Sequence, residues 1–241
     1  MPLGRSRTSG VTRMHLHLLS SPGEEPIRDV VDAIRAYLET SSRPLVAYVP
    51  AASEGPPGEY LSLTRSAFSG LAEVELVDLA SGGLGVASKV LSDSSVIYIP
   101  GGNTYLLAER LRSTGLFEEL RLLVREGLPL VGFSAGMVIL GRSLAMSNDL
   151  NYVGLEDHSG LGLVPFTFAV HYSDEDPERE AFRKRLSAFQ RKSTPPVLAL
   201  QDGAYLRVDG VLLSLVRGRC FLFKGGQEGK LLEIGAELAA A

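Results

Sequence analysis

The stretch LVGFSAGMVIL, residues 130–140, decides the fold of this chain. Its first four residues form an apolar run typical of a buried strand, and its last four open an apolar run that favours a helix. Between them lies the pattern Gly-x-Ser-x-Gly, from Gly132 to Gly136. Small residues allow the tight turn on which a serine is exposed between a strand and a helix. The stretch therefore predicts an α/β fold with Ser134 as a nucleophile on that turn.

Strands and helices alternate on either side of this stretch. The strands expected from short apolar runs are 15–20, 45–49, 74–79, 96–99 and 130–133, and the helices are 26–38, 60–71, 104–111 and 117–125. This alternation predicts a mostly parallel sheet with helices on both faces. After Pro195, strands follow one another with short turns, at 197–200, 204–208, 211–216, 220–223 and 230–234. They predict antiparallel strands at one edge of the parallel sheet.

Length and composition predict one domain over residues 14–241, preceded at 1–13 by a disordered leader or a remnant of cloning. A net charge of −4 argues against nucleic acid as a partner. No apolar run reaches the roughly 18 residues of a membrane-spanning helix. The single cysteine, Cys220, cannot form an intrachain disulfide and favours a cytoplasmic location. No His-x-x-x-His motif or cysteine pair indicates a metal site, and no cofactor is expected.

A serine nucleophile needs a base, and the chain has four histidines. His171 ends the apolar run 166–170 and opens a polar loop, which is where α/β enzymes place their sites. We therefore predict His171 as the base, the alternative being a strand-end histidine with a structural hydrogen bond. The backbone N–H of Ala135, at the start of the expected helix, is placed to stabilise an oxyanion.

Two further parts of a site stay open on these residues alone. Gly101 and Gly102 follow a buried strand and could point N–H groups at a ligand, but a helix capped by Asn103 or Thr104 is the simpler interpretation. For the acid that orients the histidine, the carboxylates after Ser134 include Asp149, Glu156 and Asp157. Their spacing does not choose among them.

Four segments resemble the family of peptidase E (aspartyl dipeptidase) and cyanophycinase. They are IYIPGGNTYLLAERL, LVGFSAGMVIL, SNDL and GLGLVPFTFAVHYSD, beginning at residues 97, 130, 147 and 160. The segment LQDGA, residues 200–204, also resembles a strand turn of the family. The resemblance implies a fold related to class I glutamine amidotransferase domains. It implies that Ser134 is the nucleophile and His171 the base, with oxyanion donors at Gly101, Gly102 and Ala135. Asp149 orients the histidine by the peptidase E pattern, and Glu156 is the alternative by the cyanophycinase pattern.

One segment departs from the family. After His171, peptidase E carries a longer loop with glycine and arginine that is associated with the aspartyl side chain of its substrate. Here residues 172–180 are shorter and strongly acidic. We therefore expect a weaker preference for an N-terminal aspartate. Asn103, Arg179 and Arg183 are candidate substrate contacts, and for the two arginines a solvated helix face is the alternative.

These observations predict a serine exopeptidase that hydrolyses short peptides, in the manner of a dipeptidase, through a Ser-His-Asp/Glu triad and an acyl-enzyme. The expected partner is a short peptide, with a homodimer left open. Two other functions are the alternatives. One is an esterase of the α/β-hydrolase type, and the other is a non-catalytic amidotransferase-like binding domain.

Overall fold

The computed structural model describes residues 13–21, 24–56, 58–79, 83–175, 177–190 and 195–240. The helices are α1 Glu24–Glu39, α2 Glu59–Ala67, α3 Gly83–Asp93, α4 Thr104–Ser113, α5 Leu116–Arg125, α6 Ala135–Val138 and α7 Glu178–Gln190. The strands are β1 His15–Leu19, β2 Leu45–Tyr48, β3 Glu73–Leu76, β4 Val96–Ile99, β5 Leu130–Phe133, β6 Thr167–Ala169, β7 Val197–Leu200, β8 Tyr205–Asp209, β9 Leu212–Arg217, β10 Cys220–Phe223, β11 Lys230–Leu232 and β12 Glu237–Ala239.

The large sheet confirms the predicted α/β fold. Within the described residues it has eight strands in the order β12-β9-β8-β1-β5-β4-β2-β3. The five strands from β1 to β3 in this order run parallel, and β8, β9 and β12 extend the sheet antiparallel from β1. The parallel strands all end at the same edge, so Ser134, which follows β5, lies beside the residues that follow β4.

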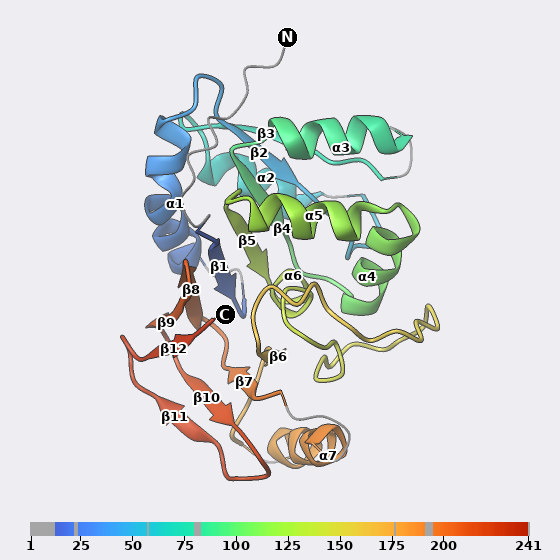
Figure 1. Cartoon of the computed structure of the whole chain (residues 1–241), viewed down its shortest axis with the longest axis vertical. Coiled ribbons are helices and arrows are strands. Elements are labelled where there is room, and N and C mark those ends of the chain that lie inside the picture. Colours follow the sequence, from blue (N-terminus) through green and yellow to red (C-terminus); the bar gives the residue numbers. More distant parts are fainter. Residues whose placement is uncertain are drawn as a thin grey trace.

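Helices cover both faces of the large sheet (Figure 1). On one face, α1 and α2 pack on alternate strand residues such as Tyr48, Tyr98 and Phe133. Helices α3, α4 and α5 pack on the other face, against residues such as Leu18 and Ile97. Consecutive strand residues point to opposite faces, so a strand buried on both sides is apolar throughout. This explains the continuous apolar runs of the sequence.

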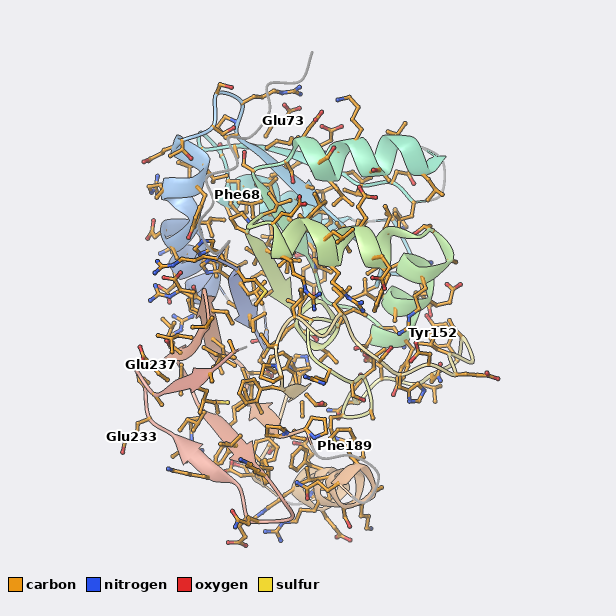
Figure 2. The ribbon with its side chains drawn as sticks, in the orientation of Figure 1. Phe68, Glu73, Tyr152, Phe189, Glu233 and Glu237 are labelled. Atoms are coloured by element: carbon orange, nitrogen blue, oxygen red, sulfur yellow. The ribbon has the colours of Figure 1, made fainter. Side chains whose placement is uncertain are left out.

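The sequence predicts that the late strands all lie at one edge of the large sheet. This prediction is wrong, because the structure divides them between two sheets. In the described part of the chain, four strands form a second, smaller sheet in the order β11-β10-β7-β6, in which β6 and β7 are parallel. Its core is a separate cluster closed by α7, and Phe189 of that helix belongs to it (Figure 2). The turn from Gln201 to Ala204 carries the chain from β7 in the small sheet to β8 in the large one. Hairpin signals mark turns but do not show on which turn a chain changes sheets.

The leader at 1–13 lies outside the described residues, apart from Arg13. Cys220 is fully buried in the main core, and burial raises the pKa of its thiol to about 12. A thiol that stays protonated is inert, which fits a packing residue.

No helix in the described part of the chain is long and apolar enough to cross a membrane.

The buried His17 on β1 makes stability depend on pH. Its Nδ1 and the hydroxyl of Tyr205 share a hydrogen bond of 2.6 Å, and burial, together with the nearby charge of Arg207, lowers the pKa of His17 to about 3. An unfolded histidine titrates near 6.5. Between these values the unfolded chain binds a proton that the folded chain does not, so the free energy of unfolding falls as the pH drops from 6.5 towards 3.

Urea unfolding at pH 7, 5 and 4 measures this effect. We expect the wild type to lose several kcal/mol over this range, and the variant His17→Phe to lose distinctly less because it cannot bind the proton. The two proteins are compared by the slope of their free energy of unfolding against pH, because the substitution also changes packing and therefore the absolute values. Equal slopes for the two proteins would contradict the assignment.

Candidate active site

Ser134 occupies a strained turn between β5 and α6. Its φ is 49° and its ψ is −111°, a conformation that non-glycine residues rarely adopt. The flanking glycines are required by space. A Cβ on Gly132 would lie 2.4 Å from the carbonyl oxygen of Gly136, and one on Gly136 would lie 2.2 Å from that of Ile99. The pattern Gly-x-Ser-x-Gly is therefore fixed by close backbone approach, and it presents the serine side chain at the end of the strand.

Three side chains form a hydrogen-bonded row at this turn. Ser134 Oγ lies 2.8 Å from His171 Nε2, and His171 Nδ1 lies 2.5 Å from Oδ1 of Asp202. His171 also has a positive φ of 55°. The predicted pairing of Ser134 with His171 is therefore present. The predicted acid is not in place. The carboxylate at His171 Nδ1 belongs to Asp202, and neither Asp149 nor Glu156 lies there.

The small sheet explains why Asp202 meets the histidine. Strands β6 and β7 are parallel neighbours, with Ala169 opposite Ala199. His171 lies two residues beyond the end of β6, and Asp202 lies two residues beyond the end of β7. Parallel neighbours end at the same edge, so these two side chains come together although 31 residues separate them along the chain.

Asp149 lies elsewhere, and one oxygen of its carboxylate accepts three hydrogen bonds. Its Oδ2 accepts hydrogen bonds from Thr104 N at 2.7 Å, from Thr104 Oγ1 at 2.6 Å and from Ser147 Oγ at 2.9 Å. The carboxylate thus caps the N-terminus of α4, where negative charge is favourable. Glu156 is exposed on the loop that follows. Asp149 therefore ties this loop to the helix that starts directly after Gly101 and Gly102.

The end of β1 connects all three members of the row. Ser134 N donates to the carbonyl oxygen of Leu19 at 2.9 Å. The buried hydroxyl of Ser20 accepts from His171 N at 3.0 Å and donates to the carbonyl oxygen of Leu200 at 3.3 Å. Ser20 N donates to Ala204 O at 3.1 Å, across the turn that carries Asp202. One strand end thus fixes the backbones of segments that come from both sheets.

The Gly101-Gly102 turn lies directly against the nucleophile. A Cβ on Gly101 would lie 3.2 Å from Ser134 Cβ, and one on Gly102, whose φ is 136°, would lie 2.3 Å from the carbonyl oxygen of Ala52. Asn103, predicted as a substrate contact, instead caps α4. Its Oδ1 accepts from Tyr105 N and Leu106 N, and its Nδ2 donates to Leu150 O at 2.9 Å. The side-chain atoms that could bind a substrate are therefore engaged by backbone.

A cavity of about 320 Å³ opens beside Ser134 and His171. Its other lining residues are Tyr48, Pro50, Ser53, Pro56, Gly58, Tyr60, Tyr98, Pro100, Gly101, Gly102 and Phe133. Ligand pockets measure roughly 300–1,000 Å³, so this one suits a small ligand. The cavity, the nucleophile and the glycine turn form one site at the carboxyl edge of the large sheet.

Comparison with known proteins identifies the family of this site. The profile of peptidase family S51 matches residues 16–216. The chain belongs to peptidase family S51. It is 33% identical over 234 residues to peptidase E of Streptomyces coelicolor, a match that covers 94% of each protein. It is 33% identical over 148 residues to a "Probable alpha-aspartyl dipeptidase" of Drosophila melanogaster, covering 58% of this chain and 62% of that protein.

Two solved structures resemble this S51 peptidase. One, from Listeria monocytogenes EGD-e, is provisionally assigned as a peptidase E; it has a TM-score of 0.67 and 26% identity, with 85% of this chain and 98% of that one covered. The other, a peptidase from an acI-B1 actinobacterium, has a TM-score of 0.71 and 18% identity over 95% and 98% of the chains, and it supports the fold alone. The predicted serine peptidase of the dipeptidase type is thereby confirmed, and neither the esterase nor the non-catalytic domain is favoured.

The predicted arginine contacts lie away from the cavity of this S51 peptidase. Arg183 faces a separate cleft between α7 and the turn that joins β10 to β11, where its Nη2 lies 3.5 Å from Glu228 Oε1. Arg179 is half-buried near Tyr172, and like Arg183 it is absent from the described lining of the cavity. The exposed helix face, which the sequence left as the alternative, therefore describes Arg183, whereas Arg179 is half-buried beside Tyr172.

The acidic segment after His171 is also turned away from the cavity. Asp174 accepts a hydrogen bond from Gln201 Nε2 at 2.8 Å and lies 3.3 Å from Arg219 Nη1. Glu180 pairs with Lys184 one helical turn later, at 2.8 Å. None of the described acidic side chains of this segment lines the cavity. Their charges therefore give no direct reason for or against an anionic substrate.

Proposed function

We propose that this chain is a serine dipeptidase in which Ser134, His171 and Asp202 form the catalytic triad. The observation that carries the proposal is the row of two short hydrogen bonds from Ser134 Oγ through His171 to Asp202. Such a row is the arrangement that activates a serine. Two of the relatives are named for peptidase E and an alpha-aspartyl dipeptidase, which supports very short peptides as substrates.

In the proposed mechanism, His171 Nδ1–H donates a hydrogen bond to the carboxylate of Asp202, which holds the tautomer whose Nε2 is free to accept a proton from Ser134. The serine oxygen attacks the peptide carbonyl, and the new oxyanion is stabilised by the N–H groups of Gly101, Gly102 and Ala135. His171 then donates its proton to the leaving amine. Water, activated by the same histidine, hydrolyses the acyl-enzyme. Each step uses side chains or amides of this chain.

The size of the cavity favours an exopeptidase, because 320 Å³ lies at the small end of ligand pockets. We also propose that the enzyme works in the cytoplasm. The buried, unpaired Cys220 is compatible with a reducing compartment, where disulfides do not form.

Covalent labelling tests the proposed nucleophile. A fluorophosphonate probe should modify the folded protein at Ser134, identified by mass spectrometry of its peptides, and the labelled protein should lose hydrolysis of Leu-Leu. A panel of p-nitrophenyl esters measured alongside the dipeptides separates a peptidase from an esterase. Labelling at a different serine, or ester turnover without hydrolysis of dipeptides, would overturn the proposal.

A further inference from the structure

We propose that the cavity beside Ser134 is a subsite for an apolar or aromatic side chain, carried by the substrate residue whose carbonyl the serine attacks. In a dipeptide this is the N-terminal residue. The inference rests on the proposed function and adds to it the class of substrate.

Three aromatic residues from three neighbouring parallel strands line the side of the cavity that lies over the sheet, which we call its floor. Tyr48 of β2 and Tyr98 of β4 stack with ring centroids 5.5 Å apart, and Tyr98 and Phe133 of β5 lie 5.2 Å apart. All three are buried in the core that α1 and α2 cover. Offset ring pairs at these distances attract one another, and they pack well against a further aromatic or aliphatic group. The floor is therefore rigid and largely apolar.

The rim is formed by the start of α2 and the segment before it. Pro56 and Gly58 line the cavity on this side, and Tyr60 stands at its edge with 63% of its surface exposed. A large exposed aromatic side chain at the mouth of a pocket buries apolar surface when a ligand covers it, which favours binding. We infer that the ring of Tyr60 closes over the side chain of a bound substrate.

The cavity offers no partner for a carboxylate side chain. Among its described lining residues, His171 is the only one that can carry a positive charge, and the proposed mechanism uses it as the base. Arg110 contacts the outside of segment 50–56, where its Nη1 donates to the carbonyl oxygens of Ala51 and Ser53, the latter at 2.5 Å. Moving a carboxylate out of water without a cation beside it costs free energy, whereas moving an apolar side chain out of water is favourable. The lining therefore selects against aspartate.

The position of the base assigns the cavity to the acyl side of the substrate. His171 reaches Ser134 from the small sheet and donates its proton to the leaving amine, so the leaving residue lies on that side. The remaining lining residues come from the ends of β2, β4 and β5 and from the start of α2. The side chain attached to the reacting carbonyl is then the one that points into the aromatic cavity.

A dipeptide series measures this preference at each position. kcat/KM is determined for Phe-Leu, Leu-Leu, Ala-Leu and Asp-Leu, and for the reversed pair Leu-Phe and Leu-Asp. We expect Phe-Leu and Leu-Leu to exceed Asp-Leu by tenfold or more, with a smaller difference between Leu-Phe and Leu-Asp. A preference for Asp-Leu, or a larger effect at the second residue, would overturn the subsite while leaving a dipeptidase in place.

The variants Tyr60→Ala and Leu63→Ala form a matched pair on α2. Leu63 is similarly exposed, at 51%, but it does not line the cavity. We expect Tyr60→Ala to lower the ratio of Phe-Leu to Ala-Leu turnover threefold or more, through KM, and Leu63→Ala to leave that ratio unchanged. Equal ratios in both variants would remove Tyr60 from the subsite and contradict the proposed rim. If no dipeptide is hydrolysed at all, the proposed function fails and the subsite with it.

Discussion

Replacing Asp202 with asparagine is expected to lower kcat by about 10³- to 10⁴-fold. The asparagine amide can donate a hydrogen bond to Nδ1, which favours the tautomer with its proton on Nε2. That proton would face Ser134 Oγ, now 2.8 Å away, and the histidine could no longer accept from it. Steady-state hydrolysis of Leu-Leu measures the loss, and an unchanged circular dichroism spectrum shows that the fold persists.

The control is Asp149→Asn, at the carboxylate that the sequence had indicated. Its amide oxygen can still accept from Thr104 and Ser147, so the cap of α4 persists in weakened form. We expect less than a tenfold loss of kcat. If Asp149→Asn were as inactive as Asp202→Asn, the acid of the triad would have to be reassigned.

Ser134→Ala and His171→Ala should each lower kcat at least 10³-fold. The double variant should have a kcat no lower than that of either single variant. Members of a triad act as a unit, so their losses do not add. The strained backbone at Ser134 is as unfavourable for alanine as for serine, so the variant should unfold at a similar temperature. Hydrolysis within tenfold of the wild type would rule out Ser134 as the nucleophile.

The position of Ser134 on a turn between a strand and a helix could be predicted because its signal is local. The strand, the turn and the helix around Ser134 lie within eleven consecutive residues, and the close approach that demands Gly132 and Gly136 is visible as glycine in the sequence. His171 was also within reach, since an apolar run ends just before it. The parallel sheet follows from apolar runs that alternate with amphipathic ones.

The acid could not be predicted in the same way because its signal is not local. Asp202 follows an apolar run just as His171 does, and the segment LQDGA had already been noted as a strand turn. What the sequence did not show is that the strand before it pairs in parallel with the strand before His171. With all late strands placed at one antiparallel edge, Asp202 had no reason to meet the base. The resemblance to peptidase E indicated Asp149 instead, and in the structure that carboxylate caps a helix.

The residues predicted as substrate contacts do not line the described cavity, for a simpler reason. Polar and charged side chains near a site have ordinary structural uses, and Asn103 and Arg183 serve two of them, a helix cap and a surface ion pair. The cavity is instead lined by rings whose positions in the sequence look like core residues. A buried strand that ends in an aromatic residue gives no sign that the ring also faces a ligand.

The hydrogen bonds around Ser20 have a consequence for how the enzyme folds. Strand β1 pairs with β5 and β8, whose residues come far later in the chain, as in the pairings of Leu16 with Leu130 and with Val208. Such long-range pairings close large loops and form slowly. Until they close, Leu19 and Ser20 cannot hold the backbones of the nucleophile and the base, so a nascent or half-folded chain contains every triad residue and lacks the triad. The proposed triad can therefore assemble only in a chain whose strand β1 has already paired with β5 and β8.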